Sequence, residues 1–79
     1  MDKDTVMKEL NDIFVQVLGT PDLQLTADLS ADDIDEWDSL TNMTIVSEIE
    51  KHWGVKFKLR DIIRMKNIGD MVDTILKKA

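Results

Sequence analysis

The sequence predicts an all-α domain: a small antiparallel four-helix bundle with three main helices, one short helix and a long loop between helices 1 and 2. Three segments repeat their apolar residues at helical spacing, and glycine, proline or a capping side chain bounds each of them. The one strand-like run, residues 55–59, has no second run with which to form a sheet. A chain of 79 residues holds one domain, so we assign residues 1–79 to it.

The first helix is predicted over residues 3–18, where five apolar residues share one face at 3.6 residues per turn: Val6, Leu10, Ile13, Phe14 and Val17. Gly19 and Pro21 end it, because glycine tolerates a left-handed cap and proline cannot continue the hydrogen-bond ladder. Residues 19–37 form a long connection that is too apolar for a solvated linker. We expect five of its residues to hold it over the helices: Leu23, Leu25, Leu29, Ile34 and Trp37.

The second helix is predicted over about residues 39–52, with Asp38 as its N-cap and Gly54 after its end. Its apolar stripe comprises Leu40, Met43, Val46, Ile49 and Trp53, with Ile45 beside it. Residues 55–59 alternate apolar and basic side chains, which is typical of a strand, but without a partner strand an extended connection is expected. Residues 60–65 can form one short helix.

The last helix has the clearest pattern. Asn67 can cap it, and Asp70 three residues later completes a pair similar to a capping box. Lys77 and Lys78 suit the negative end of the helix dipole. Its apolar residues follow the i, i+3, i+4, i+7, i+8 template: Ile68, Met71, Val72, Ile75 and Leu76.

Charge is divided unevenly along the chain. The formal net charge is −6, yet residues 1–50 hold 13 acids and 2 bases, whereas residues 51–79 hold 8 bases and 3 acids. Seven acids and no base lie in residues 22–38. That segment fits a solvated acidic loop, and it also fits a face that steers basic partners. The acidic balance argues against nucleic-acid binding, which needs cations opposite the phosphates.

Composition limits the class of protein further. No cysteine is present, which excludes disulfides, thiol catalysis and thiolate metal sites. No apolar run approaches the roughly 18 residues of a membrane span, and the polar start lacks a signal core. We expect a cytoplasmic, monomeric binding or carrier module rather than an enzyme, because a core this small leaves little room for a deep active site.

Spacing excludes two kinds of site. A calcium loop that starts at Asp28 would place Asp33 at position six and Ser39 at position twelve, where glycine and glutamate are needed. A start at Asp33 places Trp37 at a ligand position. Ser39 and His52, the single histidine, would lie about 20 Å apart on one helix at 1.5 Å per residue. A nucleophile and its base need hydrogen-bond contact, so hydrolysis by this pair is excluded.

Ser39 remains as the candidate functional residue. It is predicted at the first position of a helix, exposed and next to the capping Asp38. Unpaired N–H groups and the positive end of the helix dipole would favour a phosphate ester on its hydroxyl. A serine at a helix start also fits a purely structural role, so physics alone leaves both interpretations open.

The tripeptide Asp38-Ser39-Leu40, preceded by Glu36-Trp37, resembles the attachment motif of the acyl carrier protein family. The resemblance covers essentially the whole chain: its length, its acidic balance, its helix–loop–helix order and two further motifs, Ile49-Glu50 followed by Trp53-Gly54-Val55, and Asn67-Ile68-Gly69-Asp70. It implies that Ser39 carries 4′-phosphopantetheine from coenzyme A, attached by a magnesium-dependent phosphopantetheinyl transferase. The thiol of that arm would hold acyl groups as thioesters for acyl-loading and acyl-processing enzymes.

The resemblance also implies roles for other residues. Asp38 would engage the transferase, and Leu40 would dock partners and anchor the turn. Partner-binding residues would be Asp35, Glu36, Met43, Glu48 and Glu50. A cavity for the acyl chain between the second and third helices would be lined by Met43, Val46, Ile62, Met65 and Met71, which ordinary core packing explains equally well.

The sequence departs from the family pattern in its charges. Carriers of fatty-acid synthesis have a strongly acidic second helix, whereas only two acids, Glu48 and Glu50, lie on the exposed stretch here. The segment that follows is unusually basic: Lys56, Lys58, Arg60, Arg64 and Lys66. This favours a discrete carrier in specialised, polyketide-like or cell-envelope synthesis. A peptidyl carrier and an unmodified acidic interaction module remain alternatives.

Overall fold

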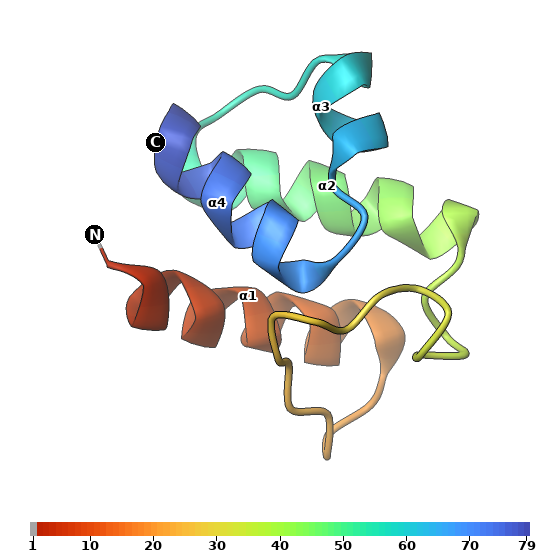
Figure 1. Cartoon of the computed structure of the whole chain (residues 1–79). Coiled ribbons are helices and arrows are strands. Elements are labelled where there is room, and N and C mark those ends of the chain that lie inside the picture. Colours follow the sequence, from red (N-terminus) through yellow and green to blue (C-terminus); the bar gives the residue numbers. More distant parts are fainter. Residues whose placement is uncertain (1) are drawn as a thin grey trace.

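The computed structural model describes residues 2–79 and confirms the predicted all-α architecture (Figure 1). The four helices are α1 (Lys3–Leu18), α2 (Ser39–Trp53), α3 (Leu59–Arg64) and α4 (Ile68–Lys78). No strand occurs in the described part of the chain, and residues 55–58 form the expected extended connection. The short helix begins at Leu59, one residue earlier than predicted, and ends at Arg64.

Capping sets the ends of the two longest helices. Asp2 accepts a hydrogen bond from the Thr5 backbone N–H at 2.8 Å and so begins α1. Gly19 (φ 66°) and Gly54 (φ 65°) end α1 and α2 in the left-handed conformation, which only glycine adopts without a steric penalty. Both glycines were predicted as helix ends.

The start of α4 differs in one detail from the prediction. The Asn67 side chain accepts a hydrogen bond from the Asp70 N–H at 2.8 Å, as expected of an N-cap. The Asp70 carboxylate, however, accepts from the backbone N–H of Lys66 at 3.1 Å rather than from that of Asn67. The predicted capping-box pair is therefore only half formed, because Asp70 binds the residue before the cap.

The core is one cluster built from α1, α2, α4 and the long loop. α1 packs against both α2 and α4, and α3 lies on the far side of the bundle from α1 (Figure 1). α3 contributes no buried residue. The largest fully buried side chains are Phe14, Leu10, Ile45, Ile49, Ile68, Met71, Ile75 and Val6. The predicted apolar faces of α1 and α4 are confirmed, with Val17 and Leu76 at their half-buried edges.

The apolar stripe of α2 is narrower than predicted. Ile45, Val46 and Ile49 are buried and Trp53 is half-buried, whereas Leu40 is 79% and Met43 55% exposed. The buried residues of α2 begin at Ile45, so Leu40 and Met43, nearer the start of the helix, lie outside the core. A helical period assigns side chains to a face, but it does not show how far along the helix the partner reaches.

The long loop between α1 and α2 is packed down by its apolar side chains, as expected. Leu25, Ile34 and Trp37 are buried, and Leu23 and Leu29 are half-buried against the core. In Figure 1 the loop runs beside α1 before it turns up to the start of α2.

Hydrogen bonds to helices hold the loop at two further points. The amide of Asn11, on α1, donates to the Leu23 carbonyl at 3.1 Å and accepts from the Leu25 N–H at 2.7 Å. At the start of α4, the Ile68 N–H donates to the carbonyl of Leu29 at 2.9 Å. The loop is thus bound to both helices that it crosses, which fixes where α2 begins.

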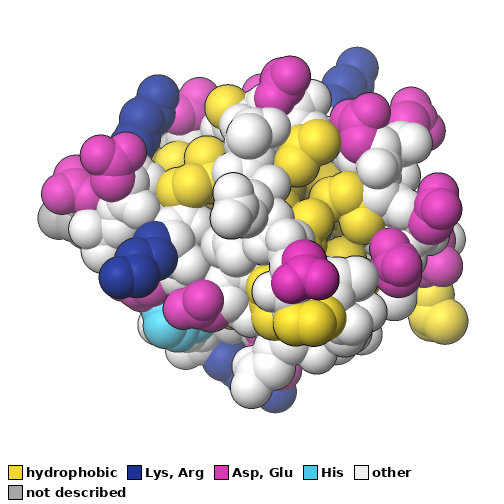
Figure 2. All heavy atoms as spheres, turned by 90° about the horizontal axis from the view of Figure 1, so that it is seen from below, with side chains coloured by type: hydrophobic (Ala, Val, Ile, Leu, Met, Phe, Trp, Pro, Cys, Tyr) yellow, Lys and Arg dark blue, Asp and Glu magenta, His cyan; other side chains and the backbone are white. Residues whose placement is uncertain are grey.

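Acidic side chains are distributed over the face formed by α1 and the loop. Figure 2 shows several of them on the side of the molecule where, in Figure 1, the loop leads into α2. Within residues 2–79, no helix has the length and apolar character needed to cross a membrane.

Candidate functional site

The position of the site is set by Trp37, the last residue of the loop before the Asp38-Ser39-Leu40 motif. Its side chain is only 4% exposed. Its ring lies edge-on to that of Phe14, with centroids 4.9 Å apart and an interplanar angle of 87°. Its indole Nε1–H donates to the Asn42 side-chain oxygen at 2.9 Å. Because Trp37 is anchored in the core, the residues that follow it emerge at the surface.

Asp38 is the N-cap of α2, as predicted. Its carboxylate accepts hydrogen bonds from the N–H groups of Leu40 at 3.0 Å and Thr41 at 2.9 Å. A second hydrogen bond runs in the opposite direction: the hydroxyl oxygen of Thr41 accepts from the Asp38 backbone N–H at 2.8 Å. The same hydroxyl donates to the Glu36 carbonyl at 2.9 Å. This capping box, which sequence analysis missed because threonine replaces the usual glutamate at its third position, fixes the backbone on both sides of Ser39.

The cap keeps Asp38 ionised. The hydrogen bond from the Thr41 backbone N–H lowers the pKa of the Asp38 carboxyl, and the Thr41 side chain and the Leu40 N–H act in the same direction. A negative charge therefore lies beside Ser39 throughout the neutral pH range.

Ser39 is the first residue of α2, and its side chain is exposed. The N–H groups at the start of α2 are not all free to bind a phosphate, contrary to the expectation from the sequence. Two N–H groups of the first turn, those of Leu40 and Thr41, already bind Asp38 and are not open to a ligand. A phosphate ester on Ser39 would instead depend on the helix dipole and on nearby cations.

A cavity of about 170 Å³ opens beside Ser39. It connects the start of α2 with the segment between α3 and α4, and its lining residues are Ala31, Trp37, Asp38, Ser39, Asn42, Met65 and Lys66. Lys66 supplies a cation and Met65 an apolar wall. Sequence analysis did not place Asn42 and Lys66 beside Ser39, because their proximity to it arises from the fold.

Leu40 lies outside the core. At 79% exposure it is free to contact a partner but does not anchor the turn, which corrects the second half of its predicted role. Trp37 anchors this turn instead.

The predicted partner-binding residues fall into two groups. Asp35, Glu36 and Met43 are exposed near the start of α2. Glu48 and Glu50 have contacts within the chain. The carboxylate of Glu48 lies 3.8 Å from the Lys51 ammonium, and that of Glu50 accepts a hydrogen bond from the Phe57 N–H at 2.8 Å. Glu50 therefore fixes the connection after α2.

The five residues predicted to line an acyl cavity differ in their exposure. Met65 lines the cavity beside Ser39. Val46 and Met71 are buried in the bundle, Ile62 is half-buried on α3, and Met43 is 55% exposed.

His52, which was predicted at the surface, is exposed at the end of α2, where its Nε2 contacts the carboxylate of Glu9 on α1.

Comparison with known proteins now identifies the class. Residues 8–75 match the family model described as a phosphopantetheine attachment site. The chain is 33% identical over 76 residues to an acyl carrier protein of Rhodococcus erythropolis, a match that covers 95% of this chain and 82% of that protein.

Solved structures agree. The fold matches the solution structure of a holo acyl carrier protein from Geobacter metallireducens with a TM-score of 0.88 and 40% identity, over 92% of this chain and 84% of that one. A putative acyl carrier protein from Mycobacterium tuberculosis shares the fold, with a TM-score of 0.82 at 24% identity over 91% and 96% of the two chains.

The chain thus belongs to the proteins that carry a covalently attached 4′-phosphopantetheine. Among these it is a member of the acyl carrier protein family, whose members are carriers rather than enzymes. Members of the family interact with a modifying transferase and with acyl-processing enzymes. The site around Ser39 fits such a group in three respects: an exposed hydroxyl, the start of a helix, and a partly apolar cavity with a lysine.

Proposed function

We propose that Ser39 is the residue of this carrier that bears 4′-phosphopantetheine. The observation that supports this most directly is the exposed Ser39 side chain at the first residue of α2, directly after the ionised Asp38 cap. The buried Trp37 and the Thr41 capping box hold this hydroxyl at a fixed place on the surface. A transferase can therefore approach it without local unfolding.

The attachment step assigns Ser39 the role of nucleophile. Its Oγ loses a proton and forms an ester bond with the phosphorus that bears the pantetheine portion of coenzyme A. The phosphoanhydride bond of coenzyme A breaks, and the nucleotide portion leaves with that electron pair. The transferase supplies the base and the magnesium ion. Asp38 fixes the helix start and presents a negative charge, while Lys66, lining the neighbouring cavity, can partly neutralise the phosphodiester that forms.

The test is the mass of the protein after incubation with coenzyme A, magnesium and a phosphopantetheinyl transferase of broad specificity. We expect one phosphopantetheine adduct on the native chain and none on Ser39→Ala. Ser47→Ala is the matched control, because Ser47 is another exposed serine of α2 and its loss should leave the adduct intact. An adduct that persists in Ser39→Ala, or no adduct on the native chain, would contradict the proposal.

The loaded group is proposed to be an acyl intermediate of a specialised or polyketide-like pathway rather than of general fatty-acid synthesis. This rests on the exposed surface of α2, in which one of the two acids pairs with Lys51 and the other binds backbone. We propose that the carrier works as a cytoplasmic monomer. Mass spectrometry of the protein from its source would identify the thioester, and an aminoacyl group there would assign it to peptidyl carriers instead.

We also propose roles for the residues around Ser39. Asp35 and Glu36, exposed in the loop next to Ser39, are placed to contact cations of the transferase, and the exposed Leu40 and Met43 to contact apolar partner surfaces. For the acyl chain, Met65 provides the entrance at the Ser39 cavity. Val46, Ile62 and Met71 lie deeper, and an acyl chain would reach them only if the helices separated.

A further inference from the structure

α3 exposes two adjacent rows of side chains of different character. Leu59 and Ile63, four residues apart, are 73% and 64% exposed. Arg60 and Arg64 form a second exposed row beside them, one residue further along the helix. None of the six residues of α3 is buried. Exposed large apolar side chains next to arginines are typical of protein interfaces rather than of free surface.

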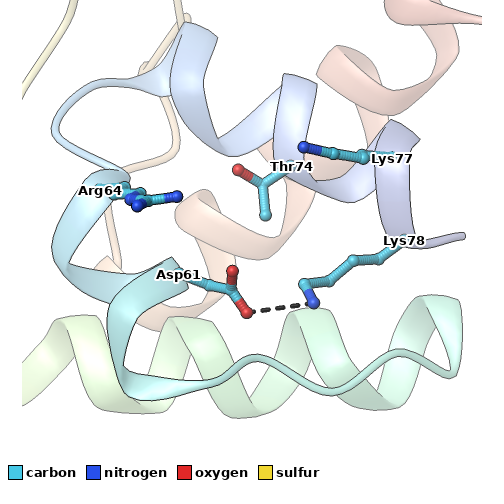
Figure 3. A pocket seen from close by; sticks show the side chains of 5 residues that line it. All are labelled: Asp61, Arg64, Thr74, Lys77 and Lys78. Carbon is cyan, nitrogen blue, oxygen red and sulfur yellow. Dashed lines mark ion pairs between the residues drawn. The ribbon is translucent and has the colours of Figure 1, made fainter.

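The basic surface of α3 extends to α4, where Lys77 lines the same cavity as Arg64. Asp61 holds α3 against the end of α4 through an ion pair with Lys78, in which the atoms lie 3.1 Å apart. Next to this pair a cavity of about 360 Å³ separates the two helices, lined by Asp61, Arg64, Thr74, Lys77 and Lys78. Figure 3 shows the side chains of Arg64 and Lys77 on either side of Thr74, away from the Asp61–Lys78 pair.

The surface formed by α3 and the end of α4 carries more basic than acidic side chains: Arg60, Arg64, Lys77 and Lys78 against Asp61. Within residues 2–79, no ion pair involves Arg60, Arg64 or Lys77, whereas Asp61 and Lys78 neutralise each other. Two acids of α4, Asp70 and Asp73, lie near this surface, since they line a neighbouring cavity together with Arg64 and Lys77. Asp73, however, pairs with Lys3, and the Asp70 carboxylate accepts a hydrogen bond from the Lys66 N–H. The acids of α2 also have other partners. Glu48 lies beside Lys51, and Glu50 binds the Phe57 backbone.

The same surface adjoins the proposed attachment site. Met65 and Lys66, which follow α3 directly, line the cavity beside Ser39. An enzyme that acts on a group tethered at Ser39 would therefore cover the end of α3 as well as the start of α2. The surface that it meets at α3 is apolar and basic, whereas the seven acids of residues 22–38 lie on the loop side of Ser39.

We propose that the acyl-processing partners of this carrier dock on α3 through an acidic surface with apolar side chains at its centre. This inference rests on the proposed function of Ser39. Carboxylates of the partner would contact Arg60 and enter the cavity lined by Arg64 and Lys77, and its apolar side chains would cover Leu59 and Ile63. Charge complementarity selects this partner, because a basic surface would be repelled at α3 and drawn to the loop.

The experiment uses two synthetic amphipathic helical peptides of equal length and leucine content, one with glutamate and one with lysine at its polar positions. Each is titrated into the ¹⁵N-labelled holo-protein at low salt, and amide shifts are recorded. We expect the glutamate peptide to shift α3 and Lys77, and the lysine peptide to shift residues 22–38. Arg60→Glu should weaken binding of the glutamate peptide about fivefold. Lys8→Glu, the same charge change at an exposed residue of α1, should change it by less than about twofold.

Three results would overturn the inference: equal α3 shifts with both peptides, no α3 shift with the glutamate peptide, or α3 shifts that follow protein concentration alone and so indicate a second copy of the chain. The mass of the same sample reports phosphopantetheine on Ser39 separately. Failure of the docking inference and failure of the proposed function are therefore distinguishable.

Discussion

At the scale of single residues, the site depends on adjacent side chains with opposite environments. Trp37 is buried and hydrogen-bonded, Asp38 is bound to the first turn of α2, and Ser39 is exposed. These two anchored residues fix the position of the third: the Ser39 hydroxyl directly follows a buried indole and a helix cap and has little freedom to turn inward. Presentation of Ser39 is thus a consequence of its neighbours.

Asp38 can be tested by comparing alanine and asparagine. Asp38→Ala removes both cap hydrogen bonds and should lower the thermal midpoint by several degrees, whereas Asp38→Asn keeps an acceptor and should lower it less. Both variants remove the charge, so both should slow loading of Ser39 if the carboxylate contacts the transferase. Circular dichroism melts and loading rates separate the two effects, and native loading by Asp38→Asn would refute the contact.

Glu50 provides a second test at this scale. Glu50→Ala removes the acceptor for the Phe57 N–H and should destabilise the fold by about 1 kcal/mol, with faster hydrogen exchange at that amide. Glu48→Ala, at the other acid of α2, should leave the Phe57 amide protected, since the Glu48 carboxylate pairs with Lys51 and not with the Phe57 backbone. Equal exchange in the two variants would show that the Glu50 hydrogen bond contributes nothing in solution.

At the scale of elements, the long loop acts as part of the scaffold. Its apolar residues enter the core, and its backbone binds the Asn11 side chain on α1 and the start of α4. Because the loop ends at Trp37, any movement of it would displace the start of α2. Asn11 is the residue whose role the sequence did not reveal, since an asparagine in mid-helix usually faces solvent.

Asn11→Ala should therefore weaken the loop more than an ordinary helix substitution. It removes one donor and one acceptor from half-buried backbone groups, and we expect a loss of about 2 kcal/mol in the free energy of unfolding. Urea denaturation measures this loss. Gln16→Ala, at an exposed position of the same helix, is the control and should change stability by less than about 0.5 kcal/mol.

At the scale of the whole molecule, the helices differ in how far they are buried in the core. α1 packs on α2 and α4, while α3 has no buried side chain and is fixed to α4 by the Asp61–Lys78 pair and to its own start by a hydrogen bond from the Lys58 N–H to Asp61 at 2.8 Å. The charges are also unevenly divided. Residues 22–38 of the loop hold seven acids and no base, whereas α3 and α4 together hold four bases and three acids. α3, the helix without a buried side chain, thus carries much of the basic surface.

Hydrogen exchange should reveal this difference. We expect amides of α3 to exchange at a lower opening free energy than those of α1 and α4, because few buried contacts oppose local unfolding there. Lys78→Ala should accelerate exchange in α3 but not in α1. Uniform exchange across the four helices would contradict this picture.

Stability should fall in acid. Hydrogen bonding lowers the pKa of four aspartates, from the Thr5 N–H at Asp2, the Thr26 hydroxyl at Asp28, the Thr41 N–H at Asp38 and the Lys58 N–H at Asp61. The folded state then binds fewer protons than the unfolded state, so the stability that these groups contribute is complete above the ordinary value of 3.8 and is lost as the pH falls through the lowered values. Thermal midpoints between about pH 7 and pH 2, at constant ionic strength, would show the loss, and a midpoint that rises below pH 4 would contradict it.

Much of the architecture was predictable because it depends on local chemistry. The bounds of α1, the glycine ends of α1 and α2, and the Asp38 and Asn67 caps follow from backbone conformations and hydrogen bonds within a few residues. The resemblance of Asp38-Ser39-Leu40 to an attachment motif likewise lies in adjacent residues. Other details were predicted wrongly, among them the burial of Leu40 and Met43 and the full capping box at Asp70. The roles of Thr41 and Asn11 were missed.

The sequence by itself determined the helices, the order of the elements and the serine at the start of α2, since each is encoded by neighbouring residues. Only the tertiary structure decided that Met65 and Lys66 line the cavity beside Ser39, that Glu50 binds backbone, and that Arg64 and Lys77 share a cavity. Those contacts join residues from different elements. Their formation depends on how the helices pack, which no periodicity within a single segment specifies.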